Sequence, residues 1–349
     1  MTQLFLQDSM ALLSQTIQAP PGVIVGPISF VLGNVINFIF NMVSFITPVG
    51  ALGFSIILMT IVVRSALLPT AFTMQRNMMK TRAMKPEMDK IKEKYGDTKD
   101  PEMRRKMSAE MQALQSKHGV NMLASCLPML ITWPLFMALF VVLGQAYLFI
   151  GNVGDAYSAI SEMIIAQGRM PDVDLIQSVI GPIATAANPS NMVLHLGTVE
   201  DMNRVVHVMN YENWEAVRSY FDGAQLAHLD NLYQQKMSVL SFFGLNLVEP
   251  AGFAWPGIIL PVLSAGTMFL AQYLMMKVNP ATDPQQANIQ KMTMIIFPVM
   301  FGVFTLTAAA GVGLYWVMLN VYLIVQQHFI HKYYVKKDEQ NRLETKAKA

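Results

Sequence analysis

Runs of about 20 apolar residues recur along this chain, and they constrain its fold more than any other feature. A helix of about 20 residues spans the hydrocarbon core of a bilayer. The first run contains the stretch FSIILMTIVVRSALLPTAF, Phe54 to Phe72, with Arg64 inside it. Four further runs of this kind follow. They predict an all-α, polytopic membrane protein with five transmembrane helices.

The composition agrees with a membrane protein. The chain has 349 residues, of which 53% are hydrophobic and only 14% are charged. A soluble domain typically has about a quarter charged residues. The mean hydropathy is +0.37, and the apolar surplus is concentrated in the runs instead of being spread evenly.

The apolar runs and the charges between them divide the chain into ten predicted segments. These are an external N-terminal segment (1–27), an external interfacial amphipathic helix (28–48), span one (49–73), a cytoplasmic helical hairpin (74–118), span two (119–150), an acidic, mostly helical external domain (151–254), span three (255–277), a cytoplasmic loop (278–291), spans four and five (292–331) and a basic cytoplasmic tail (332–349).

The distribution of charge predicts the orientation. Twelve Lys and Arg residues lie between residues 74 and 118, whereas residues 151–254 contain four, together with eleven Asp and Glu. Cytoplasmic loops carry an excess of Lys and Arg. We therefore expect the N-terminus outside and the C-terminus in the cytoplasm of a bacterial plasma membrane.

One apolar run allows two interpretations. Residues 28–46 are uncharged and long enough to span, which would give six spans and an internal N-terminus. However, Asn34, Asn37, Asn41 and Ser44 recur every three or four residues and form one polar stripe. This pattern favours a helix that lies flat at the outer interface over a sixth span.

The cytoplasmic segment predicts two amphipathic helices. Pro86 suits a first turn, and a helix begun there would end at Gly96. Asp100 and Pro101 then predict the N-cap and the first turn of a second helix. Methionines lie on one face of each: Met84 and Met88 on the first, and Met103, Met107 and Met111 on the second. They suit packing between the helices, and the flexibility of methionine also suits a surface that receives varied apolar substrates.

Motifs for catalysis are absent from the sequence. It has no Gly-rich phosphate loop, zinc-ligand spacing or serine nucleophile elbow. Its one cysteine, Cys126, allows no disulfide within the chain. We expect a protein that is not an enzyme, that needs no cofactor or metal, and that recognises no specific nucleic-acid sequence.

Arg64 needs an explanation, because a charge in the middle of a span costs about 3 kcal/mol on insertion scales. It lies about nine residues, or roughly 13 Å, from the cytoplasmic end of its run. Either the side chain extends towards the headgroups as a topology anchor, or it faces a wet cavity open to the cytoplasm. Thr60 lies one turn away on the same face, and Gln272, Tyr315 and Trp316 in other spans are further candidates for the lining of that cavity.

Several collinear motifs resemble the YidC family of membrane protein insertases. They are TIVVRSALLPTAFTMQRNMMKTRAMKPEMDKIKEKYGD, GVNMLASCLPMLITWPLFMALF, FFGLNLVEP, LPVLSAGTMFLAQYLM, TDPQQANIQKMTMIIFPVMF and GLYWVMLNVYLIVQQHFI. The sequence departs from the usual family pattern at Met122, where proline is usual, and in its long acidic external segment.

The resemblance implies a five-span core around a hydrophilic groove that is open to the cytoplasm and closed outside. It assigns Arg64 as the groove arginine and places Thr60, Gln272, Tyr315 and Trp316 at groove or substrate-contact positions. It also implies that the hairpin receives substrate, and that nascent membrane proteins, the ribosome, the Sec translocon and the lipid bilayer are partners.

The mechanism that we expect is insertion by binding and shape. Arg64 attracts a short, often acidic tail into the wet groove, which lowers its desolvation penalty, and the apolar segment then enters the bilayer. The alternative is a transporter or channel for a small anion, with Arg64 as the binding charge.

Overall fold

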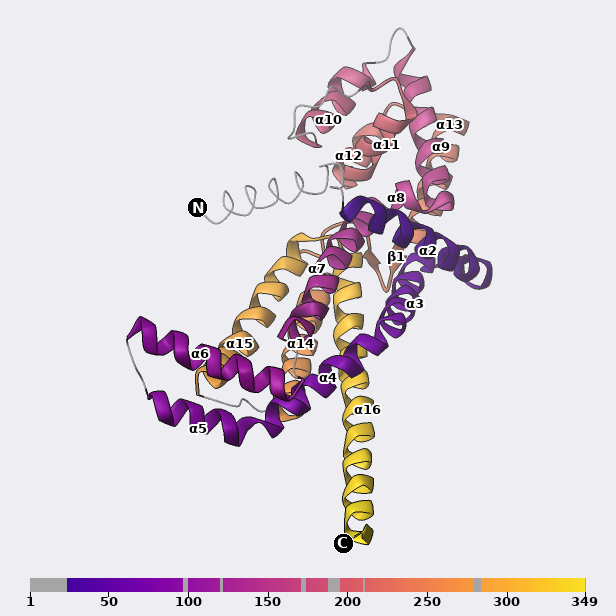
Figure 1. Ribbon diagram of the computed structural model, residues 1–349. Coiled ribbons are helices and arrows are strands. Elements are labelled where there is room, and N and C mark those ends of the chain that lie inside the picture. The colour runs from indigo at the N-terminus through magenta and orange to yellow at the C-terminus, as the bar shows by residue number, and fades with distance from the viewer. Residues whose placement is uncertain are drawn as a thin grey trace. The chain divides into compact units, whose positions relative to one another are not determined.

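We describe a computed structural model of the chain that covers residues 24–96, 100–119, 122–170, 174–187, 195–209, 211–278 and 284–348 (Figure 1). Helices account for nearly all of its regular structure, so the predicted all-α class is confirmed. The helices are α2 (Val25–Ile46), α3 (Ala51–Ala66), α4 (Leu68–Ala83), α5 (Lys85–Tyr95), α6 (Pro101–Lys117), α7 (Met122–Gly144), α8 (Ala146–Phe149), α9 (Gly151–Gly168), the π-helix η1 (Ile176–Ile180), α10 (Gly181–Ala187), α11 (Val199–Val208), α12 (Tyr211–Arg218), α13 (Gly223–Leu240), α14 (Ile259–Val278), α15 (Pro284–Thr307) and α16 (Ala310–Lys348).

The described residues include four helices that are long and apolar enough to cross a membrane. They are α2, α14, residues Ala287–Thr307 of α15 and residues Ala310–Tyr334 of α16. The pair α3 and α4 would add a fifth if it forms one span. In α14 and α15 only 17% of the apolar window is buried within the protein, and their exposed side chains include Val262, Phe269, Ile295 and Val299. Apolar surface on this scale is typical of helices whose solvent is lipid.

The first predicted span is not a single straight helix. The chain bends by 53° between α3 and α4, and Pro69 lies in the first turn of α4. Proline suits a first turn and disfavours a continued helix before it. The prediction of a span over 49–73 followed directly by the hairpin therefore missed α4, which continues to Ala83 with two buried polar side chains, Gln75 and Asn77.

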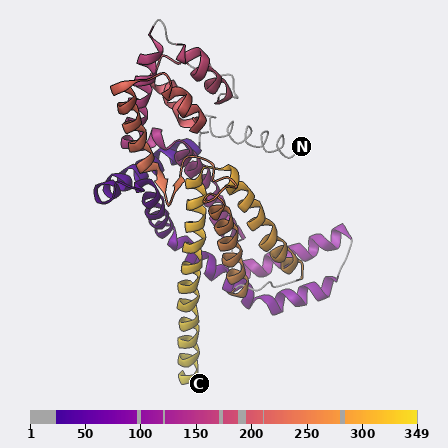
Figure 2. The ribbon, with the colours of Figure 1, turned by 180° about the vertical axis from the view of Figure 1, so that it is seen from behind.

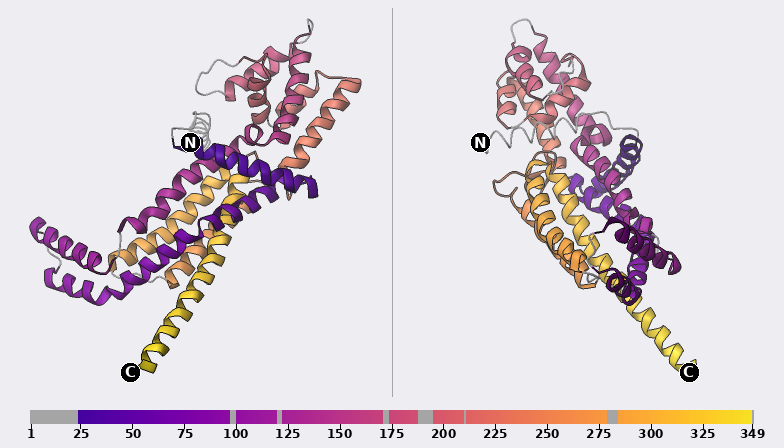
Figure 3. Two further views of the ribbon diagram at one scale, coloured as in Figure 1. Left: turned by 45° about the vertical axis from the view of Figure 1, so that its right-hand side comes forward. Right: turned by 60° about the vertical axis from the view of Figure 1, so that its left-hand side comes forward.

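The described residues form two compact units, and α3, α7, α14, α15 and α16 contribute residues to both. Among the described residues, the first unit consists of those within 24–59, 134–262 and 302–316. Most of the predicted external domain lies in it as helices α9 to α13 (Figure 3). Apolar side chains from α9, α11, α12 and α13 are buried there, including Ile160, Met202, Val217 and Leu229.

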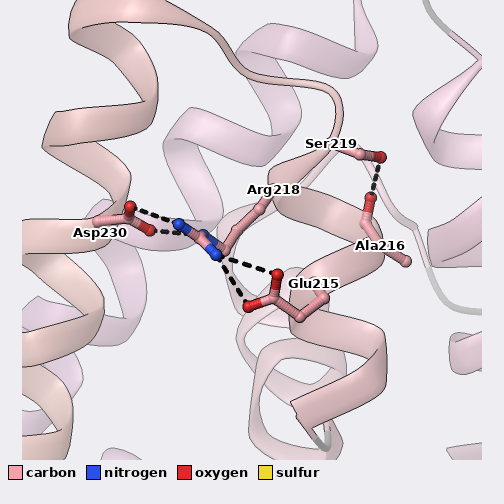
Figure 4. Close-up of polar contacts among 5 residues, drawn as sticks. All are labelled: Glu215, Ala216, Arg218, Ser219 and Asp230. Atoms are coloured by element: carbon pink, nitrogen blue, oxygen red, sulfur yellow. Dashed lines mark hydrogen bonds and ion pairs between the residues drawn. The ribbon is translucent and has the colours of Figure 1, made fainter.

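An arginine joins the last two helices of this domain. Arg218, at the end of α12, donates two hydrogen bonds to the Asp230 carboxylate of α13, at 2.7 and 2.8 Å (Figure 4). Its third nitrogen donates to both oxygens of Glu215, at 2.8 and 3.0 Å. These carboxylates raise the pKa of Arg218 above its usual value. The paired forks fix the turn between α12 and α13.

The sequence did not predict the one strand pair in the described part of the chain. Strands β1 (Ser241–Phe242) and β2 (Leu245–Asn246) form an antiparallel hairpin. The loop after β2 binds the start of α16 through the backbone, because Ala310 and Gly311 donate to the carbonyls of Glu249 and Leu247, both at 2.7 Å. These bonds satisfy amides that a helix leaves unpaired at its N-terminus.

Helix α2 has two kinds of surface in the first unit. Its buried side includes Leu32, Ile36 and Phe40. Asn37, from the polar stripe, accepts a hydrogen bond from the amide of Gly151 at 3.2 Å. Phe45, at the end of the helix, is 92% exposed. Since α2 is also long enough to span, the interfacial orientation stays a prediction.

The second unit consists of Thr60–Trp133, Leu263–Phe301 and Val317–Ala349. Helices α5 and α6 lie side by side in it, as predicted for the hairpin (Figures 1 and 2). The Asp100 side chain accepts the Glu102 amide at 3.0 Å, so the predicted N-cap is confirmed. Lys94 and Tyr95 of α5 both contact the Glu110 carboxylate of α6, at 2.5 and 3.0 Å.

Helix α16 continues well beyond the predicted fifth span. It runs to Lys348 and therefore includes residues 332–348 of the predicted basic tail. Near its middle, the Tyr334 hydroxyl donates to the carbonyl of Phe72 at 3.1 Å. The Phe72 ring also contacts Tyr333 edge-on, with the ring centroids 5.7 Å apart.

Candidate functional site

In the second unit, some helices have buried polar side chains on one face and exposed apolar side chains on the others. On α3, Thr60 is 1% exposed and Arg64 is 8% exposed. They lie four residues apart and therefore on one face of the helix. Polar groups at such positions are costly unless they are satisfied, so this face of α3 is the strongest candidate for a polar site.

Further polar contacts join the neighbouring helices of this unit. Asn320 of α16 donates to the Ser264 carbonyl and to the Thr267 hydroxyl of α14, at 3.4 and 3.2 Å. Ser65 of α3 shares a hydrogen bond with Tyr322 of α16 at 3.1 Å. Amide and hydroxyl contacts of this kind bridge helices in membranes. Helix α16 thus presents polar groups to both α3 and α14.

The predicted groove residues are divided between the two units. Thr60, Arg64 and Gln272 belong to the second unit, and Gln272 is half-buried on α14. Tyr315 and Trp316 belong to the first. The part played by these five residues in a common groove stays a prediction.

Tyr315 and Trp316 lie within an aromatic region of the first unit. Tyr315 is 2% exposed. The Trp316 ring meets Phe136 of α7 edge-on, with centroids 5.0 Å apart, and Phe136 also contacts Phe304 of α15 at 6.3 Å. These rings form an apolar contact between α7, α15 and α16.

The methionines of the hairpin have unequal access to a substrate. Met84, Met88 and Leu114 form a small core, against which Ile91 and Met111 pack. Met103 is 42% exposed, and Met107 is half-buried. Packing therefore explains Met84, Met88 and Met111, whereas Met103 and Met107 offer the accessible surface that a receiving role requires.

Two basic residues of α4 contact other segments of this unit, a role that the sequence pattern did not predict. Lys80 donates to the Gly119 carbonyl at 3.1 Å, and Arg82 donates to the carbonyl of Val278 at the end of α14. Cations are favourable near the C-terminus of a helix. The positive charge of α4 thus holds the base of the hairpin, in addition to any effect on orientation.

A second group of buried titratable residues lies in the external domain. The Lys236 ammonium is 4.8 Å from the Tyr157 ring and 5.4 Å from the Tyr233 ring. Burial lowers the pKa of Lys236 to about 8, although Glu249 opposes the shift. Burial also lowers the pKa of His207 to about 4, and the charge of Lys236 adds to this effect. The domain therefore holds charge-sensitive groups away from water.

Comparison with known proteins gives one family. The family model described as 60Kd inner membrane protein matches residues 44–338. The chain is 40% identical over 111 residues to "Membrane protein insertase YidC 1" of Bacillus anthracis, which covers 32% of this chain and 43% of the relative.

Longer alignments exist at lower identity. The chain is 26% identical over 289 residues to "Membrane protein insertase YidC" of Rickettsia felis, covering 82% of this chain and 36% of the relative. It is 27% identical over 284 residues to the protein of the same name from Marinobacter nauticus, covering 81% and 32%. The matches thus span less than half the length of these relatives.

Proposed function

The chain belongs to the 60Kd inner membrane protein family, the family of the YidC insertases, and we propose on this premise that it inserts nascent membrane proteins into the bilayer. It is a multi-pass membrane protein of bacterial type. The names of its relatives favour insertion over the small-anion transporter.

One observation carries the proposed mechanism: Arg64 and Thr60 are buried on one face of an apolar helix. Arg64 supplies the positive charge, and Thr60 and Gln272 supply hydrogen-bonding groups. A hydrophilic tail that enters here meets polar partners, which offset part of the loss of its hydration. Tyr315 and Trp316 then contact the apolar segment of the client before it leaves for lipid. Burial of about 20 apolar residues in the bilayer drives release.

The proposed orientation places α5 and α6 in the cytoplasm and helices α9 to α13 outside. With this orientation the hairpin meets a client first, and Met103 and Met107 are the methionines most accessible to it. The ribosome and the Sec translocon are proposed partners, because the family resemblance implies them. The proposed work is binding and transfer, with no covalent step.

Insertion into vesicles by the purified protein tests this mechanism. The clients are two single-span proteins whose short translocated tails differ only in charge, one acidic and one neutral. Protease protection of the tail measures insertion. We expect Arg64→Ala to reduce insertion of the acidic-tailed client more than that of the neutral one. Arg64→Lys should retain more activity, because it keeps the charge.

A matched control comes from α4 of the same unit. Arg76 is exposed, so Arg76→Ala removes the same charge without touching the buried face, and insertion should stay near the wild-type level. Equal insertion of the acidic-tailed client by wild type and Arg64→Ala would refute the electrostatic step. If Arg64→Lys were as poor as Arg64→Ala, the planar guanidinium itself would be required.

A further inference from the structure

The turn between β1 and β2 exposes an aromatic side chain on a strained backbone. Phe242 is 8% exposed, and its ring meets Phe54 of α3 edge-on at a centroid distance of 5.1 Å. The next residue, Phe243, is 85% exposed and has φ +48°. Gly244 follows with φ +78°. The two neighbouring phenylalanines thus have opposite environments.

Two positive φ angles in a two-residue hairpin turn normally select asparagine, aspartate or glycine. A phenylalanine at the first position strains the backbone, because its Cβ disfavours a positive φ. In water this cost would not be offset, since the ring is not buried within the protein. Packing within the first unit does not explain why a phenylalanine stands at this position, because its side chain is 85% exposed. An apolar environment around the turn would account for it, because the exposed ring would then be buried outside the protein.

Other exposed apolar residues lie close to this turn. The Cα of Gly244 lies beside Pro256, since a Cβ at Gly244 would be 3.7 Å from the Pro256 ring. Phe253 and Trp255, just before that proline, are 68% and 80% exposed. Gly50 lies beside β1, because its amide donates to the carbonyl of Ser238 at the end of α13 at 2.9 Å and a Cβ at Gly50 would be 3.2 Å from the Phe242 ring. Its neighbour Val49 is 66% exposed.

The charge pattern favours lipid over water around these residues. Between Lys236 and Lys277 the only charged residue is Glu249, so the exposed aromatics have no charged rim of their own. Trp255 lies four residues before α14, and Val49 lies two residues before α3, both of which are candidate membrane segments. Aromatic residues at the ends of spans occupy the headgroup region of the bilayer.

We propose that Phe243, Phe253 and Trp255 form an aromatic anchor that inserts into the bilayer interface beside the start of α14. The ligand is the lipid surface itself. The strained turn directs Phe243 outward, while Phe242 holds the hairpin against α3. The anchor would set the depth of the first unit in the membrane, a property separate from client insertion.

Nitroxide depth measurements in vesicles of phosphatidylcholine and phosphatidylglycerol test the anchor. In a Cys126→Ser background, single labels are placed by Phe243→Cys and, independently, by Phe253→Cys. Gln225→Cys is the control, because Gln225 is exposed on α13 of the same unit. Collision with oxygen reports lipid, and collision with a water-soluble nickel chelate reports solvent.

We expect labels at 243 and 253 to be more accessible to oxygen than to nickel, and the label at 225 to show the reverse. If 243 and 253 were as accessible to nickel as 225, the anchor would be refuted. Labels immobile and inaccessible to both reagents would also refute it, and would indicate a protein partner. Phe243→Asn, which suits the turn, should preserve the hairpin and shift a label at 253 towards solvent. No shift at 253 would count against a shared anchor.

Discussion

Replacement of Lys236 should change the stability of the external domain. The direction of that change depends on whether the cost of burying the ammonium exceeds the gain from its contacts with the two tyrosine rings and Glu249. The pKa of Lys236 is lowered from 10.5 to about 8, and each pKa unit corresponds to about 1.4 kcal/mol. Folding with the lysine protonated therefore costs about 3 kcal/mol, because the ammonium is less stable in the folded domain than in the unfolded chain. Replacement by methionine removes the ammonium and keeps most of the apolar stem. We expect Lys236→Met to stabilise the external domain by about 2–3 kcal/mol at pH 7.

The pH dependence follows from the same shift. Below pH 8 the lysine is protonated in both the folded and the unfolded state, so the folded domain is destabilised by the full cost of burying the ammonium. Between pH 8 and 10.5 the folded state loses its proton first, the unfolded state binds more protons, and wild-type stability rises. Tyr157 and Tyr233 face the ammonium, and burial raises the pKa of both phenols. Their ionisation in the unfolded chain opposes the rise above about pH 10. The advantage of Lys236→Met over wild type should therefore shrink between pH 8 and 10.

Trp214 offers a local readout, because its ring stacks on Tyr233 at 4.3 Å and is 3% exposed. Urea unfolding of the protein in nanodiscs, followed by the fluorescence of Trp214 at pH 7 and pH 10 in a background in which the other three tryptophans are replaced by phenylalanine, measures the stability of the domain. Gln234→Met is the matched control, since Gln234 is exposed on the same helix. If Lys236→Met were less stable than wild type at pH 7, the ring contacts and Glu249 would outweigh the loss of hydration. A stability difference unchanged from pH 7 to pH 10 would equally refute the argument.

Three further predictions concern single sites. Because burial lowers the pKa of His207 from 6.5 to about 4, stability of the external domain should fall as the pH falls from 6.5 to 4; His207→Gln should flatten that fall in the Trp214 assay. Gly257→Ala should destabilise the loop before α14 by about 1–3 kcal/mol, since a Cβ there would overlap the Ala251 carbonyl; hydrogen exchange of residues 247–258 measures this, with α9 as the internal reference. Asp100→Ala should remove the N-cap bond to Glu102 and cost about 1 kcal/mol, seen as faster exchange in the first turn of α6 while α5 is unaffected.

Residue patterns along the chain determined the class of protein and most of its helices. Long apolar runs predict helices for a membrane without knowledge of their neighbours, because the bilayer acts on each run directly. The hairpin could be predicted for a similar reason. Pro86, Gly96 and Asp100 act through local backbone geometry, and the structure places helix ends at or beside all three. Arg64 was identifiable because a charge within an apolar run is rare.

Contacts between distant segments were decided only by the tertiary structure. The bonds of Asn320 to α14 and the division of the methionines between core and surface depend on partners far along the chain. The same holds for Lys236, which the sequence presents as an ordinary surface lysine of an acidic segment. Its environment comes from α9, α13 and the loop at Glu249, and burial of a charge depends on all the surfaces that close around it.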